Sequence, residues 1–318
     1  MIAGHDHAVF LDEEYLGTFI ANGGGAVKFV VAADDAELGR FRGELEHRAA
    51  TGGYTHVQVD AVHTRVHMMD EIFFSVARQI DWDALARTAV SAAWADAAYP
   101  CPEGSEDVSV AAMALRFDVD STELSRDVNR HLQHRIYRDY NMVQEFRIAM
   151  LRLCQAQLAT GQVTTAEHEA VLSWLRGELR QMSLLQSALI YRKIARNNAR
   201  HVLFSLAHWL SINTSTGLLL EIDIRRLGFA RRPLPTEREG LYYTKAALLD
   251  AYELLRQLVD NTDELMNCCV VVVAAPEFLT DQNRGLDAYQ ALKLRIFDEV
   301  RDRVRDNPYS SLVRLGAA

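Results

Sequence analysis

The sequence predicts an α/β protein in which helices flank a parallel sheet and a large helical insertion interrupts the core. Three observations support this fold class. Apolar runs rich in β-branched residues alternate with helix-favouring segments at the start of the chain. No strand pattern occurs over residues 83–212, and apolar runs then return. We therefore expect a core made of residues 1–82 and 213–318, with residues 83–212 as a helical insertion or subdomain.

The first part of the core has a strand–helix–strand–helix pattern. Residues 1–25 end in Asn22-Gly23-Gly24-Gly25, which predicts a flexible lead-in. The run Ala26–Ala33 is almost continuously apolar, as is typical of a strand buried on both faces. The expected elements are a strand at 26–33, a helix at 35–50, a strand at 55–60 and a helix at 69–80. This order predicts parallel strands joined by right-handed crossovers.

The insertion is expected to be helical, because its apolar residues recur at helical spacing with Arg, Glu and Gln between them. The predicted helices are 124–140, 143–158, 165–182 and 188–210. In the second part of the core, an Arg- and Pro-rich loop at 225–240 follows a strand that carries an acid near its end. The predicted elements there are strands at 217–224, 268–275 and 311–315 and helices at 243–258 and 288–304.

Composition limits the classes of function. The net charge is −9, so the surface as a whole is a poor binder of nucleic acid, and any DNA contact needs a local basic patch or a partner. Cys268 and Cys269 are neighbours in an apolar strand and are expected to be small core residues. The amino terminus has no signal-peptide pattern, and no apolar stretch is long enough to cross a bilayer. We expect a cytoplasmic protein without a membrane partner.

Several stretches resemble the ATP-binding proteins of BREX-type phage-defence systems, whose core is that of an AAA-type (ASCE-like) P-loop NTPase. The similar stretches, spread over nearly the whole chain, are Gly23–Val31, Val171–Glu178 (with the sequence WLRGE), Asn198–Leu206 followed by Gly217–Asp223, and Ala274–Phe278. The resemblance implies a P-loop NTPase fold, ATP and Mg²⁺ as cofactors, and work within a complex of several proteins. The chain ends just after the last predicted strand, so we expect no C-terminal helical lid.

The phosphate-binding half of the family's site departs from its pattern here. In the family, the strand that ends at Val31 leads into GxxxxGK[ST], whose glycines, lysine and hydroxyl hold phosphates and Mg²⁺. The corresponding positions run from Ala32 to Gly39, with Leu38 at the lysine position and Gly39 at the hydroxyl position. Three acids stand within the same stretch, namely Asp34, Asp35 and Glu37. These carboxylates are expected to repel a triphosphate.

The second half of the site also differs. Asp223 stands at the Walker B position for Mg²⁺, but the next residue is Ile224 where hydrolysing members have a Glu that activates water. Glu221 shares a strand face with Asp223 and does not replace that base. We therefore expect a catalytically inactive, ATPase-like subunit without cofactors. The alternative is an enzyme that binds ATP and Mg²⁺ through Lys28 and Asp223.

Three further features suggest contacts or sites. The most basic stretch of the chain, which would contact DNA phosphates or an acidic partner, consists of Arg225, Arg226, Arg231 and Arg232. The alternative interpretation of this stretch is a solvated loop whose arginines pair with Glu237 and Glu239. Arg295 is placed where an arginine finger could act in trans on a neighbouring subunit's nucleotide. His63 and His67 are expected to be loop residues and not zinc ligands.

A nuclease built from acids at the strand ends is a weaker alternative. Asp60, Glu221 and Asp223 could meet there, but Ile224-Arg225-Arg226 does not supply the lysine that such a site needs after its second acid. The favoured hypothesis is a structural or regulatory subunit that pairs with an active ATPase or another defence protein, with DNA contacted through the complex.

Overall fold

The computed structural model describes residues 1–101, 107–229, 240–297 and 307–316. Contacts divide the chain into two compact units. Residues Met1–Val76 and Leu210–Ala318 form the α/β unit, and Ala77–Trp209 form the helical unit. The limits at residues 82 and 212 that we inferred from the sequence stay predictions of where the insertion begins and ends.

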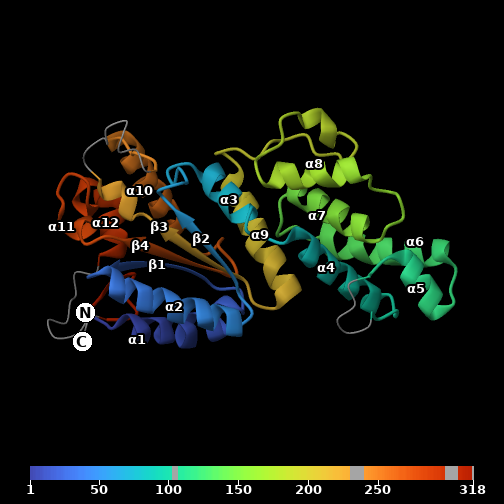
Figure 1. The fold of residues 1–318 in the computed structure, drawn as a ribbon, viewed down its shortest axis with the longest axis horizontal. Helices are drawn as coiled ribbons and strands as arrows, with labels where there is room; N and C mark the ends of the chain where they lie inside the picture. The colour runs from blue at the N-terminus through green and yellow to red at the C-terminus, as the bar shows by residue number, and fades with distance from the viewer. Residues whose placement is uncertain (102–106, 230–239, 298–306, 317–318) are drawn as a thin grey trace. The chain divides into compact units, whose positions relative to one another are not determined.

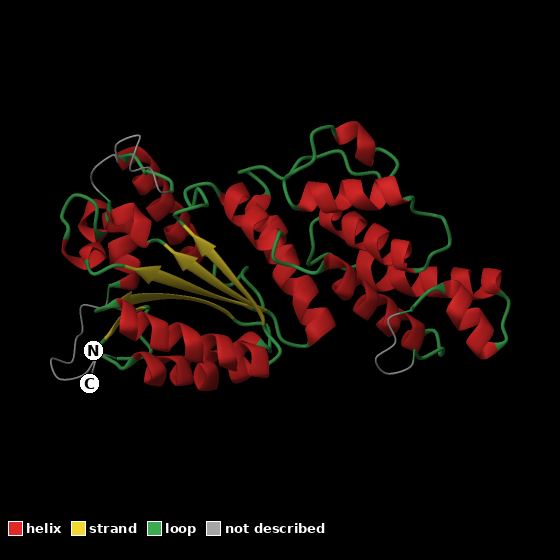
Figure 2. Cartoon of the chain, in the orientation of Figure 1, coloured by secondary structure: helices red, strands yellow, loops and turns green. Residues whose placement is uncertain are grey.

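The α/β unit is built on five parallel strands in the order β2-β3-β4-β1-β5 (Figures 1 and 2). The strands are β1 (Gly25–Ala32), β2 (Thr55–Asp60), β3 (Leu218–Asp223), β4 (Cys268–Ala274) and β5 (Leu312–Leu315). The predicted α/β class with a parallel sheet flanked by helices is confirmed. The arrangement is consistent with a P-loop NTPase-like fold.

The strands form where the sequence is most apolar. Every residue of β3 and β4 is buried, including Cys268 and Cys269, which are core residues as predicted. From β1 the chain crosses to the far edge strand β2, and it then returns through β3 and β4 and passes over β1 to β5. The connection that leaves β1 therefore runs toward the β2 edge of the sheet, whereas the connection that leaves its neighbour β4 runs toward the β5 edge. In open parallel sheets, ligands bind outside the carboxyl ends of the strands at such a reversal.

Helices cover both faces of this sheet. On one face lie α1 (Gly4–Leu11), the π-helical η1 (Asp12–Ile20) and α2 (Asp35–Thr51), which share one core with sheet residues such as Val30 and Val273 (Figure 1). On the other face, Phe278 stacks on Phe29 and contacts Tyr252 edge to face. The remaining elements of this unit are α3 (Met69–Ala77), η4 (Arg225–Gly228), α10 (Lys245–Asp260), α11 (Glu277–Thr280), η6 (Leu286–Ala288) and α12 (Gln290–Ile296).

The prediction that residues 1–25 form a flexible lead-in is wrong, because α1 and η1 occupy most of this stretch. Their buried apolar side chains are Ala8, Leu11, Leu16 and Ile20, with spacings of three, five and four residues. This mixture of α- and π-helical spacing has no single period, so a search for one helical repeat misses it. The strand bridge between Ile2 and Leu315 also holds the amino terminus against β5.

The described residues of the helical unit contain no strand, in agreement with the sequence pattern (Figure 2). The helices are α4 (Trp82–Asp96), α5 (Val110–Phe117), α6 (Ser121–Leu132), the π-helical η2 (Gln133–Tyr137), α7 (Gln144–Gln157), α8 (Thr165–Leu175), η3 (Met182–Leu185) and α9 (Ala199–Thr214, whose end lies in the α/β unit). Two predicted helices were too long. The first, α8, stops before Gly177, whose φ of 75° is left-handed and favours helix termination. The second, α9, begins after Leu189, whose φ is 60°.

Candidate functional site

The connection from β1 to α2 is where a phosphate-binding loop would lie, and it is short. Only Ala33 and Asp34 separate the end of β1 from Asp35, the first residue of α2. Of the positions that correspond to the family's loop, Ala32 belongs to the strand and 35–39 belong to the helix. A Walker loop needs a run of residues between strand and helix to wrap the phosphates. This connection has no such run.

Carboxylates already occupy the amino-terminal end of α2. Asp34 is extended, and its Oδ1 accepts the Glu37 N–H at 2.8 Å as an N-cap. Glu37 is buried, and its Oε2 accepts the Gly4 N–H at 2.9 Å. Hydrogen bonds from Arg40 and then from the Gly4 N–H hold the pKa of Glu37 below its usual value. The helix end that binds phosphate in P-loop proteins is therefore satisfied by acids of its own chain.

Leu38 and Gly39, which we predicted to stand at the positions of the Walker lysine and hydroxyl, carry no cationic or hydroxyl group. The Leu38 side chain is buried in the core beneath α2. Gly39 lies on the exposed side of the helix, and an added Cβ would meet nothing within 4 Å. Neither residue contributes to a phosphate site.

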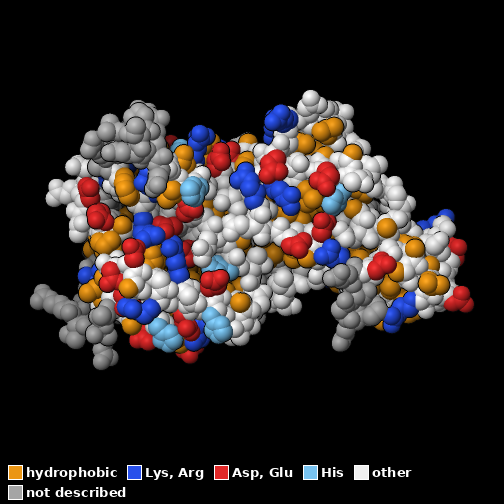
Figure 3. All heavy atoms as spheres, viewed as in Figure 1, with side chains coloured by type: hydrophobic (Ala, Val, Ile, Leu, Met, Phe, Trp, Pro, Cys, Tyr) orange, Lys and Arg blue, Asp and Glu red, His pale blue; other side chains and the backbone are white. Residues whose placement is uncertain are grey.

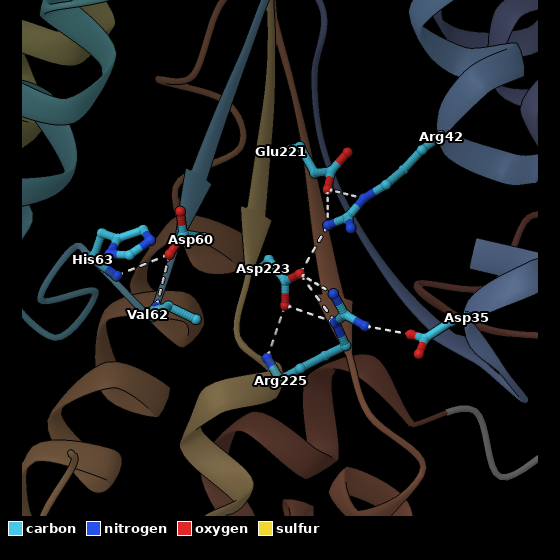
Figure 4. A network of polar contacts seen from close by, with 8 residues as sticks. All are labelled: Asp35, Arg42, Asp60, Val62, His63, Glu221, Asp223 and Arg225. Carbon is cyan, nitrogen blue, oxygen red and sulfur yellow. Dashed lines mark hydrogen bonds and ion pairs between the residues drawn. The ribbon is translucent and has the colours of Figure 1, made fainter. Parts of the chain in front are cut away.

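Beside this connection, a charged network joins α2 to the end of β3 (Figure 4). We call it the Arg42–Arg225 network, and its members are Asp35, Arg42, Glu221, Asp223 and Arg225. The Arg42 guanidinium donates through Nε to Glu221 Oε1 at 2.6 Å and through Nη2 to Asp223 Oδ2 at 2.9 Å. Arg225 donates from Nη2 to Asp223 Oδ2 at 2.8 Å and from Nη1 to Asp35 Oδ1 at 2.8 Å.

Burial makes this network electrostatically strong. Asp223 is 9% exposed and Glu221 is 1% exposed. Burial pushes the pKa of Asp223 upward, but hydrogen bonds from Arg225 and Arg42 outweigh it, so that pKa lies below its usual value. For Glu221 the burial dominates over Arg42, and its pKa is raised. Glu221 Oε2 is buried without a hydrogen-bond partner, which contributes to the same direction of shift.

Two guanidinium groups bind the carboxylate of Asp223, the residue that the sequence predicts at the family's Mg²⁺-binding position. Both carboxylate oxygens of Asp223 accept hydrogen bonds from arginine. Among the described residues, no group of three or more His, Cys, Asp or Glu side chains could hold a metal ion. The cavity at this edge, lined by residues that include Arg225, Ala275 and Arg284, has a volume of about 10 Å³, which suits about one water molecule.

Lys28 lies away from this edge. It is in the middle of β1, level with Glu221 but two strands away, which corresponds to about 10 Å between backbones. Its Nζ donates to the Tyr309 carbonyl at 2.8 Å and lies 4.4 Å from the centre of the Tyr15 ring. Burial lowers the pKa of Lys28 to about 8. The ammonium group therefore points toward β5 and not toward Asp223.

The arginines predicted to contact a partner or DNA have different positions. Arg225 belongs to the Arg42–Arg225 network, and Arg226 donates to the Leu241 carbonyl at 2.8 Å and lies over the Phe229 ring. Arg231, Arg232 and the acids proposed to pair with them lie outside the described residues. Arg295, in α12, pairs with Asp260 and has a side chain that is 38% exposed. Ile224 is buried and only its backbone joins the site, donating its N–H to the Val273 carbonyl.

The acids and histidines considered for metal or nuclease chemistry are held in other ways. Asp60 lies beside Asp223 in the sheet register, but its Oδ1 accepts the Val62 and His63 N–H groups at 2.8 Å (Figure 4). It therefore caps the turn after β2. His63 and His67 both lie in that turn, as predicted, and not in a helix.

Sequence reasoning missed Arg42, although a signal was present. Arg42 follows Leu38 by four residues and precedes Leu45 by three, so it lies within the apolar stripe of α2. A charged residue in a buried stripe needs a buried partner. Figure 3 shows basic and acidic side chains interspersed over the part of the surface formed by α2, with no large patch of one sign.

Comparison with known proteins identifies a family. A family model described as "BREX system ATP-binding protein BrxC/D" matches residues 106–317, more than half of the chain. The matched residues include β3, β4 and β5 with Asp223 and Arg225, whereas Gly23–Val31 and Arg42 lie before them. No curated protein and no solved structure matches the chain. No helix among the described residues has the length and hydropathy needed to cross a membrane.

Proposed function

The chain belongs to the BREX system ATP-binding protein family BrxC/D, and from this premise we propose that it is a subunit of a phage-defence system that neither binds nor hydrolyses ATP. On this proposal it acts as a structural or regulatory component by binding other protein subunits, among them an active ATPase or another defence protein. DNA is contacted through the resulting complex.

The observation that carries the proposal is the state of Asp223. In hydrolysing P-loop proteins the equivalent acid must be available to Mg²⁺. Here Asp223 is buried and pairs with Arg42 and Arg225 at 2.9 and 2.8 Å. A metal ion would have to displace both guanidinium groups, and the partly buried arginines would then each lose a counter-charge.

The phosphate side of the site supports the same proposal. Asp34 is the N-cap of α2, and Asp35 and Glu37 lie in its first turn, where the helix dipole favours negative charge. A triphosphate would compete with these acids for the same positive end of the helix. No lysine or hydroxyl follows within this turn to compensate, since Leu38 is buried and Gly39 has no side chain.

The alternative function is an ATP-binding, Mg²⁺-dependent enzyme that uses Lys28 and Asp223. The geometry disfavours it, because Lys28 lies four residues before the end of β1, about 13 Å from the carboxyl edge of the sheet.

For Arg295 we retain the proposal of an arginine finger that acts in trans. Since it pairs with Asp260, it would have to leave that carboxylate when a neighbouring subunit binds. Arg225, Arg226, Arg231 and Arg232 remain proposed contacts for a partner or DNA.

Thermal melting with and without Mg-ATP tests the proposal. We expect the melting curve to stay unchanged up to millimolar Mg-ATP. If the chain bound ATP, a ligand concentration of 100 times Kd would add about 2.7 kcal/mol of stability and raise the melting temperature by several degrees. A well-characterised P-loop ATPase melted in the same buffer provides the positive control.

Two variants distinguish the alternative if a shift is found. ATP binding through Lys28 and Asp223 should disappear in the variants Lys28→Met and Asp223→Asn. Loss of the shift in either variant would support the alternative and contradict the proposal. Equilibrium dialysis with labelled ATP repeats the measurement without heating. The partner role is tested separately, by purification of the tagged chain with its native defence proteins and identification of those that remain bound in the presence of high salt.

A further inference from the structure

A surface of the helical unit combines exposed aromatic rings with cationic side chains. We call it the basic–aromatic face, and its members are Tyr137, Tyr140, Arg147, Tyr191, Arg192 and Lys193. It lies outside the α/β unit and plays no part in the site described above. The first three residues come from η2, the turn that follows it and the start of α7, and the last three from the chain that precedes α9.

The tyrosines of this face are unusually exposed for large aromatic residues. Tyr140 is 83% exposed, Tyr191 is 66% exposed and Tyr137 is 48% exposed. Aromatic side chains normally bury most of their surface in a core or an interface. Tyr137 and Tyr140 share the Arg147 guanidinium and so lie together, and rings as open as these are available for stacking with a ligand.

Arg147 holds two of these rings in place. Its guanidinium carbon lies 4.7 Å from the centre of the Tyr140 ring and 5.7 Å from that of the Tyr137 ring. Its Nη1 donates to the Tyr137 carbonyl at 2.7 Å. A single guanidinium therefore orders both tyrosines, and the greater part of the Tyr140 ring surface stays open to a further stacking partner.

An ion pair connects the two segments of the face. Arg192 Nε lies 3.6 Å from the carboxylate of Glu145, a residue of the first turn of α7. The Trp174 indole donates to the Arg192 carbonyl at 2.9 Å and fixes the backbone there. Tyr191, Arg192 and Lys193 are all exposed on this fixed stretch. Both segments thus present aromatic and basic groups from an ordered backbone.

The backbone of the first segment has an uncommon form. The π-helical η2 spans Gln133–Tyr137 and directly follows α6. Such underwound turns are rare and are often found at functional sites. Arg138 caps its end and is exposed, and no described residue forms an ion pair with it. This adds a further cation beside Tyr137.

We infer that the basic–aromatic face binds single-stranded nucleic acid. Bases stack on exposed aromatic rings whatever their sequence, and arginine and lysine neutralise the phosphates between them. The chain carries a net charge of −9, so a local group of cations beside open rings is not a general property of its surface. Stacking requires unpaired bases, and the face therefore distinguishes single strands from duplexes.

Fluorescence anisotropy with the full chain tests this inference. The probes are a labelled 20-nucleotide DNA strand, the same sequence as RNA, and the DNA duplex. We expect the single strands to bind more tightly than the duplex, with an affinity that falls as salt rises. Similar affinities for DNA and RNA would indicate that stacking and phosphate contacts account for binding. Different affinities would indicate an additional contact with the sugar. Both results support the inference.

Variants separate stacking from simple attraction. Tyr140→Ala should weaken single-strand binding about tenfold, the effect of losing one stacked base. Tyr140→Phe keeps the ring and should bind like the parent chain. Lys193→Ala should reduce the salt dependence. Arg116→Ala is the matched control, because it removes one positive charge, as Lys193→Ala does. Arg116 lies against the Phe117 ring in α5 and takes part in none of the contacts of this face.

Three results would overturn the inference. The first is the absence of binding to any probe at low salt. The second is a duplex that binds as tightly as the single strand. The third is a Tyr140→Ala variant that binds the single strand with the affinity of the parent chain, because the interaction would then depend on charge alone. The inference does not depend on the proposed inactivity toward ATP, because melting with Mg-ATP and binding of oligonucleotides are measured separately.

Discussion

Replacement of Arg42 by methionine should destabilise the α/β unit by an amount that depends on pH. Arg42 is the hydrogen-bond partner of Glu221, which is only 1% exposed, and the arginine side chain itself is 25% exposed. Methionine keeps much of the aliphatic stem and removes the charge. Asp223 keeps its contact with Arg225, so Glu221 is the group that loses its partner.

The free energy of unfolding that the variant loses is limited by the cost of protonating Glu221. Removal of one member of a buried ion pair costs about 3–5 kcal/mol. A buried carboxylate can limit this cost by protonation, which from its usual pKa of 4.5 requires about 3.4 kcal/mol at pH 7 and about 0.7 kcal/mol at pH 5. We therefore expect a loss of at most about 3.4 kcal/mol at pH 7 and less than about 1 kcal/mol at pH 5.

The sign of the pH dependence is fixed by linkage. Burial already raises the pKa of Glu221 above 4.5 in the parent chain, and the variant lacks the Arg42 contacts that lower it. The folded variant therefore retains a proton on Glu221 at pH values where the unfolded chain has released it. Stability is therefore greatest below pH 4.5 for this group and falls by about 1.4 kcal/mol per pH unit as pH rises toward the folded pKa.

Equilibrium unfolding in urea, followed by far-UV circular dichroism at pH 5 and pH 7, measures the effect. All four tryptophans, Trp82, Trp94, Trp174 and Trp209, belong to the helical unit, so their fluorescence provides a second readout from the unit that was not altered. In the double variant Arg42→Met, Glu221→Gln the buried acid is absent. That variant should recover most of the stability lost at pH 7.

The reasoning would be refuted by an Arg42→Met variant that loses the same free energy at both pH values. Such a result would mean that packing of the arginine stem, and not its charge, stabilises this part of the chain. A double variant as unstable as the single one at pH 7 would lead to the same conclusion.

Three further predictions concern α2 and the start of β1, and the same urea titration measures all of them. Asp34→Ala removes the N-cap of α2 and should cost about 1 kcal/mol, whereas Asp34→Asn should retain most of it; equal losses in the two would argue against the cap. Gly39→Ala lies in the exposed helix with nothing within 4 Å of the added methyl group, and it should stabilise the chain by about 0.5–1 kcal/mol. Gly25→Ala would place a Cβ 2.3 Å from the Thr262 carbonyl oxygen and should destabilise by about 1–3 kcal/mol; a stable Gly25→Ala variant would contradict the packing described at the start of β1.

The strands of the sheet could be predicted because their signal is local. A strand buried on both faces needs apolar residues at almost every position, and the run from Cys268 to Ala274 meets that requirement without any knowledge of its neighbours. The end of a parallel strand is also local, so the position of Asp223 at the carboxyl edge of the sheet followed from the sequence.

The missed helices have a weak local signal. In α4 the buried positions between Trp82 and Trp94 are filled mainly by alanine, including Ala86, Ala89 and Ala93, which contrast little with the exposed side. In α1 and η1 the spacing of apolar residues changes from one turn to the next. Packing against the sheet and the neighbouring helices stabilises these segments, and that contribution is not visible in a short window of sequence.

For the candidate site, the sequence by itself determined which groups are absent: a lysine and a hydroxyl after β1, and an acid after Asp223. Only the tertiary structure decided what takes their place. Arg42 and Glu221 are 179 residues apart in the chain, and folding brings them within 2.6 Å. Two buried carboxylates must be neutralised by some cation, and the packing of α2 on β3 decides that arginines of the chain itself provide the charge.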